Sequence, residues 1–406
     1  MVQEKSGSFT LDSFLFPRLF SSFRMAIQPS RLATAYLAVA VIAFSGWVIH
    51  LLRGALVGDS QTTAAYVPIS DRAVIDPVAF LAARFHNALF ALLDLDFSGF
   101  VGAVADCFRM LAWTVADRPI SSLLFFVIAL ATLSLAGGGI ARSVALQFAQ
   151  DRRTGFMAGL RFGTRSFQSL FGALMIPLGL ILLSGLPIAL LGLIGRIPYL
   201  GEILAAILLP LAFVAGVLIT VLLVGTAAAG GLMLPAIGYD GSDSFDAVGR
   251  PFAYAFAKPW HLGFYALVAA FYGAVCYFFI RFCAFLLLWV VREFLSLGFW
   301  GGEKLAQIWA EPTFTALLGS PQPMPETWSM WIAALLIRLW VLAVAGVVAA
   351  YVVSFYFTAG TICYALMRHC VDGTPIEEIY EAPGEGRQPP PSQASSPETG
   401  EKQTGE

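Results

Sequence analysis

Six long apolar runs constrain what this chain can fold into more than any other feature of its sequence. Four runs contain no formally charged residue, at 32–52, 120–140, 167–194 and 203–237, and two contain one arginine each, at 262–291 and 331–366. A helix needs about 20 mostly apolar residues to cross the hydrocarbon core of a bilayer. The sequence therefore predicts an all-α, polytopic transmembrane helical bundle of about six spans.

The composition agrees with a membrane solvent. Hydrophobic residues make up 58% of the chain and charged residues 12%, whereas a soluble domain averages about 25% charged residues. The net charge of -2 offers no basic field for nucleic acid. We therefore expect membrane lipids as partners and no nucleic acid.

The arginines and lysines outside the runs set the expected orientation. Most of them fall in the segments that lie inside if the N-terminus is inside, and loops on the cytoplasmic side carry such an excess. We expect both termini in the cytosol of a bacterium, with the chain in its cytoplasmic (inner) membrane. The expected parts are a cytosolic segment at 1–31, the bundle at 32–367, and a cytosolic tail at 368–406 that is disordered from about 382.

Two segments outside the runs have the pattern of amphipathic helices. The outer loop 53–119 places apolar residues at helical spacing on more than one face, which predicts two helices broken near Ser98 and Gly99. We expect them to lie on the membrane surface or to cap the bundle. The N-terminal segment LDSFLFPRLFSSFRMAI is a second candidate for an interfacial helix.

The inner ends of the second, fourth and sixth runs carry similar signals. Asp240 and Gly241 align with Asp372 and Gly373 after a shift of 132 residues, and the segment 156–167 aligns with 245–256 after a shift of 89. A three-fold repeat of helical hairpins would explain this pattern, and so would a general preference for such residues where a helix leaves the membrane. In the first interpretation, Asp or Ser caps a short interfacial helix and arginine faces lipid head groups.

The inner segments also carry a resemblance. The paired runs, the segment DGSDSFDAVGRPFAYAFAKPW and the ending MRHCVDGTPIEEIY resemble an uncharacterised group of bacterial multi-pass (six-span) membrane proteins. The resemblance covers residues 32–380. It implies fold and location, but no activity and no functional residue.

Five residues are candidates for contacts with lipid or solute. Arg281 and Arg338 lie within apolar runs, where an arginine must snorkel, pair or reach water. Three hypotheses follow for these two arginines: snorkelling, contact with an anionic lipid or solute, and a role in gating. Arg161, Arg250 and Trp260 are candidates for interfacial contacts.

We identify no catalytic, cofactor-binding or metal-binding residue from the sequence, and we expect no cofactor. The leading hypothesis is a non-enzymatic protein that organises or recruits a protein partner at the cytosolic face. The main alternative is a passive or facilitated transporter or channel for a small or lipid-like solute, because glycines and prolines interrupt the runs. A membrane enzyme acting on lipid is the third hypothesis. The sequence does not indicate an oligomeric state.

Overall fold

A computed structural model describes residues 16–57, 77–117, 119–298, 303–319 and 327–381. Every regular element in these ranges is a helix, which confirms the all-α class. The expected disorder from residue 382 lies outside the described residues. The elements are a 3-10 helix at Phe16–Phe20, followed by α1 (Ser21–Ala26), α2 (Pro29–Val57), α3 (Pro77–Leu93), α4 (Phe97–Asp117), α5 (Pro119–Gln150), α6 (Phe156–Arg165), α7 (Phe167–Ile194), α8 (Leu200–Asp240), α9 (Ser244–Ala257), α10 (Pro259–Gly298), α11 (Glu303–Ile308) and α12 (Trp328–Asp372).

Local sequence signals set where the long helices begin and end. Helices α2, α3, α5 and α10 each begin at a proline, whose fixed φ and missing N–H suit the first helical position. The returning helices α5, α8 and α12 are each followed by a residue in the left-handed region, namely Asp151, Gly241 and Gly373. At the latter two, glycine adopts that conformation without the steric penalty of a Cβ atom.

The helices form three units of the same design, which favours the hairpin repeat over the alternative explanation of the aligned signals. Each unit has a short helix, a long outgoing helix and a long returning helix: α1–α2–α5, α6–α7–α8 and α9–α10–α12. Asp240 and Asp372, which the repeat aligned, are the last residues of α8 and α12. The short helix α9 is capped by Asp243, whose carboxylate accepts from the backbone N–H of Asp246 at 2.9 Å.

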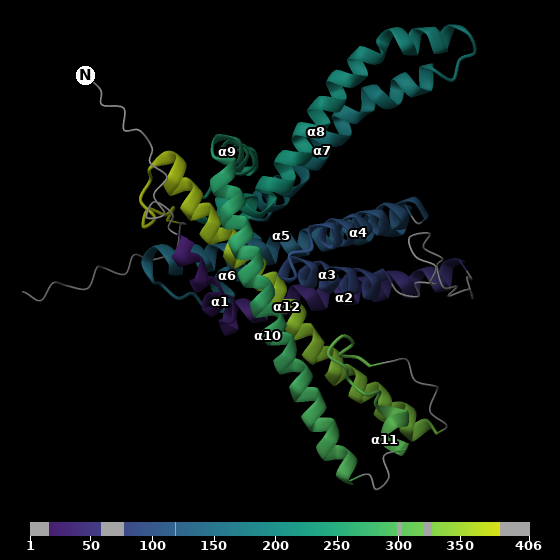
Figure 1. The fold of residues 1–406 in the computed structure, drawn as a ribbon, viewed down its shortest axis with the longest axis vertical. Helices are drawn as coiled ribbons and strands as arrows, with labels where there is room; N and C mark the ends of the chain where they lie inside the picture. The colour runs from purple at the N-terminus through teal and green to yellow at the C-terminus, as the bar shows by residue number, and fades with distance from the viewer. Residues whose placement is uncertain (1–15, 58–76, 118, 299–302, 320–326, 382–406) are drawn as a thin grey trace, which may run out of the picture.

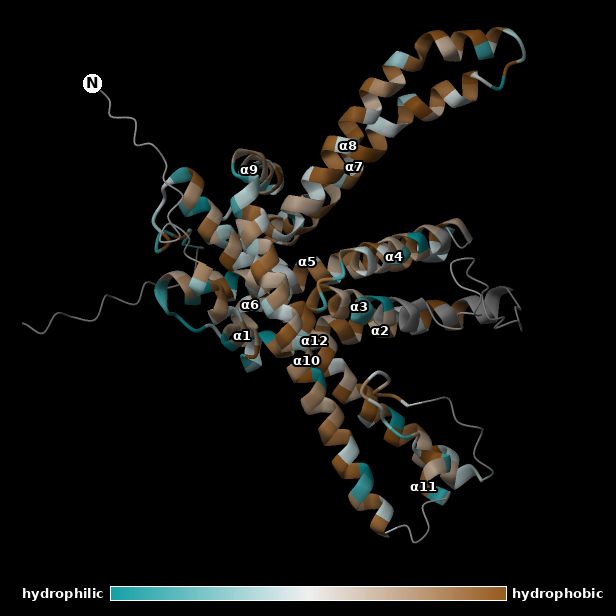
Figure 2. Ribbon diagram, in the orientation of Figure 1, coloured by the Kyte–Doolittle hydropathy of each residue, from teal (hydrophilic) through white to brown (hydrophobic). Residues whose placement is uncertain are grey.

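The three returning helices pack against one another at one end of the molecule. We call this end the base, and it comprises α1, α6, α9, residues 373–381 and the adjoining ends of α5, α8 and α12. From the base, three arms diverge, formed by α2 with α5, α7 with α8, and α10 with α12 (Figure 1). The arms are predominantly hydrophobic along their length (Figure 2).

Glycine permits the close packing of the base. A Cβ atom on Gly360 of α12 would lie 2.5 Å from the carbonyl oxygen of Gly231 of α8, and one on Gly139 of α5 would lie 2.7 Å from that of Gly159 of α6. Both distances are too short for any other residue unless backbone moves. Small residues at such contacts let helix backbones approach closely in membrane proteins.

In the described part of the chain, seven helices are long and apolar enough to cross a membrane: α2, α4, α5, α7, α8, α10 and α12. The expected count of six omitted α4. Helices α7 and α8 continue through their internal prolines, and the turn that joins them occupies residues 195–199.

The loop 53–119 differs from its expected form. It contains the two expected helices, α3 and α4, but they are joined at residues 94–96, slightly before the expected break. Ser98 and Gly99 instead lie in the first turn of α4, where each donates a hydrogen bond to the Asp96 carboxylate. The hairpin runs in the direction of the α2–α5 arm (Figure 1), with α4 against α5 and α3 against α10. Its apolar surface is therefore partly used in packing between the first and third arms.

Candidate functional site

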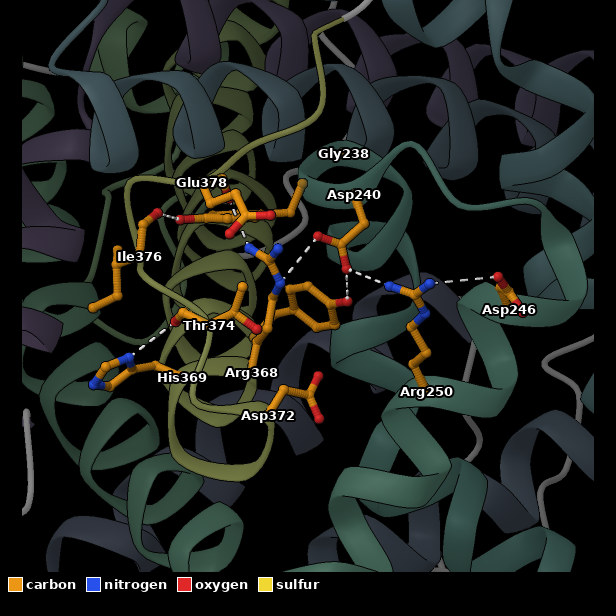
Figure 3. Close-up of polar contacts among 12 residues, drawn as sticks. Gly238, Asp240, Asp246, Arg250, Arg368, His369, Asp372, Thr374, Ile376 and Glu378 are labelled. Atoms are coloured by element: carbon orange, nitrogen blue, oxygen red, sulfur yellow. Dashed lines mark hydrogen bonds and ion pairs between the residues drawn. The ribbon is translucent and has the colours of Figure 1, made fainter.

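The densest polar network in the base surrounds Asp240 at the end of α8 (Figure 3). One carboxylate oxygen lies 3.2 Å from Nη1 of Arg250 in α9 and also accepts from the hydroxyl of Tyr364 in α12. The other oxygen lies 3.3 Å from Nε of Arg368 in α12. One carboxylate therefore joins three helices from two of the hairpin units.

Asp240 and Arg368 are largely shielded from water, whereas Arg250 is half exposed. Burial alone would lower the pKa of Arg250, but the nearby charges, Asp240 first and Asp246 among the others, outweigh it and raise that pKa. Arg250 also lies 3.6 Å from the exposed Asp246 carboxylate, one turn earlier in α9. The guanidinium of Arg250 is thus held between the carboxylates of Asp240 and Asp246, both of which belong to the base.

A second carboxylate, Asp372 at the end of α12, accepts a hydrogen bond from the hydroxyl of Tyr254 in α9. Burial, together with this hydrogen bond, raises the pKa of Tyr254, so the phenol stays protonated. Lys258, at the end of α9, donates to the carbonyl oxygen of Cys370 at 2.7 Å. Helix α9 is therefore fixed to the end of α12 at two further points.

The segment that follows α12 is held across the ends of α8 and α12. Arg368 Nη1 donates to the carbonyl oxygen of Glu378 at 2.7 Å. The backbone N–H of Tyr380 donates to the carbonyl oxygen of Tyr239 at 3.0 Å. The hydroxyl of Tyr239 donates to the carbonyl oxygen of Ile376. The sequence VDGTPIEEIY, which carried part of the resemblance, thus forms a strap over the Asp240 network.

Two arginines at the base are almost fully buried and were not recognised from the sequence as special. Arg31 donates to the Ser143 hydroxyl at 3.0 Å, the Ser143 carbonyl at 2.9 Å, the Gln147 side chain at 2.7 Å and the Met25 carbonyl at 2.8 Å. Arg142 donates to the Gly238 carbonyl at 3.0 Å and lies over the ring of Phe162. Arg31 ties α2 to α5 without a carboxylate partner among the described residues, so its charge is stabilised by oriented dipoles.

Arg281 is attached to the segment that follows α11. Its Nε and Nη2 donate to the carbonyl oxygens of Phe314 and Thr315, each at 2.8 Å, and its Nη1 donates to the hydroxyl of Tyr277 at 2.7 Å. Irregular backbone at membrane depth is tolerated where its polar groups are satisfied by protein. The guanidinium of Arg281 supplies such donors to residues 309–319.

His86 of α3 is buried beside Arg281 and the aromatic rings of Phe90 and Phe278. Both ring nitrogens are without a hydrogen-bond partner among the described residues. Burial, with a contribution from the charge of Arg281, lowers the pKa of His86 to about 4. The ring is therefore neutral near pH 7, and it joins the aromatic contact between α3 and α10.

The other candidate residues lie on the surface. Arg338 is exposed on α12, and Trp260 is 83% exposed at the start of α10. Arg161 is exposed on α6, while Arg250 belongs to the Asp240 network. The structure thus brings Arg250 into a network but leaves the five candidates in separate places. Their contacts with lipid or solute stay predictions.

The Asp240 network can hold helices together, because its carboxylates accept from arginine or tyrosine of neighbouring helices. Within the described ranges, no cluster of three His, Cys, Asp or Glu side chains could hold a metal ion. No family model, curated protein or solved structure matches this chain. The resemblance to a bacterial six-span group also stays a prediction.

Proposed function

We propose that this chain is a non-enzymatic integral membrane protein that organises or recruits protein partners at the membrane face where its base lies. We place it in a bacterial cytoplasmic membrane with both termini, and hence the base, on the cytosolic side. The excess of arginine and lysine in the segments of the base supports this orientation.

The observation that carries the proposal is the close packing of the returning helices in the base. A Cβ atom on Gly137 of α5 would lie 2.5 Å from Phe357 of α12, and one on Gly238 of α8 would lie 3.0 Å from backbone atoms of α5. The contact between α8 and α12 at Gly360 is equally close. Helices in such contact leave no room for solute between them, which favours a packed platform for partners over a conduit through the base.

The same interpretation fits the polar groups of the base. The Asp240 and Asp372 carboxylates are engaged by side chains of neighbouring helices, whereas a general acid or base needs a proton that substrate can reach. The surface around this rigid body carries exposed aromatic side chains, such as Phe245 and Trp260. These features support a binding surface in preference to a reaction centre.

Site-specific photo-crosslinking in cells tests the proposal. A photoreactive amino acid replaces Phe245 or Glu377 in the base, or Leu193 or Ile197 at the far end of the α7–α8 arm, all of which are exposed. We expect discrete protein adducts from the base positions and no discrete protein adduct from the arm positions. Adducts from the arm alone would contradict the proposal.

A conduit for a small or lipid-like solute is the second candidate, favoured by one observation. Residues 309–319 are irregular backbone that meets the apolar helix α10 at Arg281, and transporters build solute sites from broken backbone inside the membrane. Flux into vesicles containing the purified protein separates the two functions. Solute flux that Arg281→Leu abolishes, in a variant that remains folded, would favour the conduit over the scaffold.

A further inference from the structure

Helices α6 and α9 occupy equivalent positions in two hairpin units but carry different charge. Arg161 of α6 and Arg250 of α9 align in the repeat, and both are exposed. Arg250 is paired with Asp240 and Asp246. Arg161 forms no ion pair with a described residue, and α6 contains no acidic residue at all. The two helices therefore present different electrostatic surfaces to whatever lies beside the base.

The orientation of α6 is fixed by glycine contacts with α5. A Cβ atom on Gly163 would lie 2.4 Å from the carbonyl oxygen of Leu135, and Gly159 lies directly against Gly139. The opposite face of α6 presents the exposed side chains of Met157 and Arg161. This rigid attachment means that α6 cannot turn its arginine toward protein without breaking the glycine contacts.

Helix α6 lies between the ends of two long apolar helices, α5 and α7. It follows the returning helix α5, and a single residue separates it from α7, which begins with its apolar run at Phe167. The exposed Arg153 lies in the connection just before α6. A short helix with an apolar side chain, arginines and a place at the end of two spans has the pattern of an interfacial helix.

We propose that the outer face of α6 binds the phosphate of anionic phospholipid head groups through Arg153 and Arg161. Charge complementarity favours this occupant, because two exposed arginines without a described ion-pair partner lie on α6 and just before it, between the ends of the apolar helices α5 and α7. An arginine guanidinium can donate two parallel hydrogen bonds to one phosphate. The equivalent Arg250 is already paired with two carboxylates, so we expect it to bind a phosphate more weakly than Arg161.

This inference deepens the proposed function, since it names the lipid that the base contacts and rests on that function for the base lying at a membrane face. The two can fail separately. Crosslinks from the base to a protein, together with no preference for anionic lipid, would contradict the lipid site alone. Retained lipid preference without protein crosslinks would contradict recruitment alone.

Native mass spectrometry of the full-length protein in a neutral detergent tests the lipid site. Phosphatidylglycerol and phosphatidylcholine are titrated separately, and binding to the double variant Arg153→Gln, Arg161→Gln is compared with the parent. Each basic residue near an anionic surface is worth about fivefold in affinity. We expect the double variant to bind phosphatidylglycerol roughly 25-fold more weakly, with binding of phosphatidylcholine unchanged.

The matched control is the double variant Arg196→Gln, Arg338→Gln, which removes two exposed arginines far from the base. We expect it to bind phosphatidylglycerol within about twofold of the parent, since the charges lost are distant from α6. Equal loss in test and control variants would overturn the site, as would full retention in the test variant. Competition by excess inorganic phosphate as strong as that by phosphatidylglycerol would overturn the assignment to a lipid. Thermal unfolding in the same detergent verifies that each variant is folded.

Discussion

Helix α8 passes through two regions that differ in what surrounds them. In the base, its residues from Leu232 to Tyr239 are buried against α5 and α12. In the α7–α8 arm, the most apolar stretch of the same helix contains no residue buried by protein. Leucine, valine and isoleucine dominate the arm, whereas glycine and alanine become frequent in the base. The comparison teaches that hydropathy alone does not distinguish a surface that faces lipid from one that faces another helix.

The largest expected difference between the regions comes from the Asp240 network. Asp240→Ala leaves Arg368 shielded from water without its carboxylate, and loss of one partner of a buried ion pair destabilises by about 3 to 5 kcal/mol. We expect a loss near 3 kcal/mol, because Arg250 is half exposed. Reversible denaturant titration in detergent measures the change.

The control for this change is Asp246→Ala, which removes the exposed partner of the same Arg250. An exposed ion pair contributes less than about 1 kcal/mol. Similar losses for the two variants would show that the network around Asp240 does not hold the base together.

A smaller difference is expected from glycine substitutions in the two regions. Gly360→Ala in the base forces a methyl group against the Gly231 carbonyl oxygen, and overpacking of this kind costs about 1 to 3 kcal/mol. Gly216→Ala in the arm meets no atom within 4 Å, so the higher helix propensity of alanine should stabilise by up to about 1 kcal/mol. The same titration should give opposite signs, and equal signs would contradict the comparison.

The smallest difference concerns the two arginines of the α10–α12 arm. Arg281→Leu removes donors from two backbone carbonyls and should destabilise by about 1 to 2 kcal/mol, because Arg281 is only partly buried. Arg338→Leu should be neutral or stabilising, since it removes an exposed charge from an apolar helix. Thermal unfolding in detergent compares the pair. A stabilising Arg281→Leu would show that its contacts with residues 309–319 contribute nothing.

The sequence predicted the fold class, because it follows from run length. The equivalent places of Asp240 and Asp372 followed only from the hairpin-repeat interpretation, one of two explanations for the similar signals at the helix ends. The sequence did not indicate that Arg31 and Arg142 are buried, since both stand at the edge of an apolar run, where an exposed arginine is common. The two carbonyl partners of Arg281, at Phe314 and Thr315, lie more than 30 residues away in an irregular segment, which no periodicity marks. Asp106 and Arg109 interrupt the apolar pattern of α4, so no long apolar run marks this helix as a span; Asp106 pairs with Arg84 of α3 and with Arg109.

The central claim is that the base is one rigid body and that the α7–α8 arm diverges from the α10–α12 arm without packing on it. Spin-label distance measurements in lipid nanodiscs test it most directly, with labels attached through non-canonical amino acids so that the native cysteines are untouched. One pair joins the exposed positions Thr164 and Ala253 of α6 and α9, and the other joins Leu193 and Leu336 in two arms. We predict a narrow distance distribution in the base, and a long, broader one between the arms that widens further in detergent. A short, narrow distance between the arms would contradict the account, because it would mean that they close into a packed bundle.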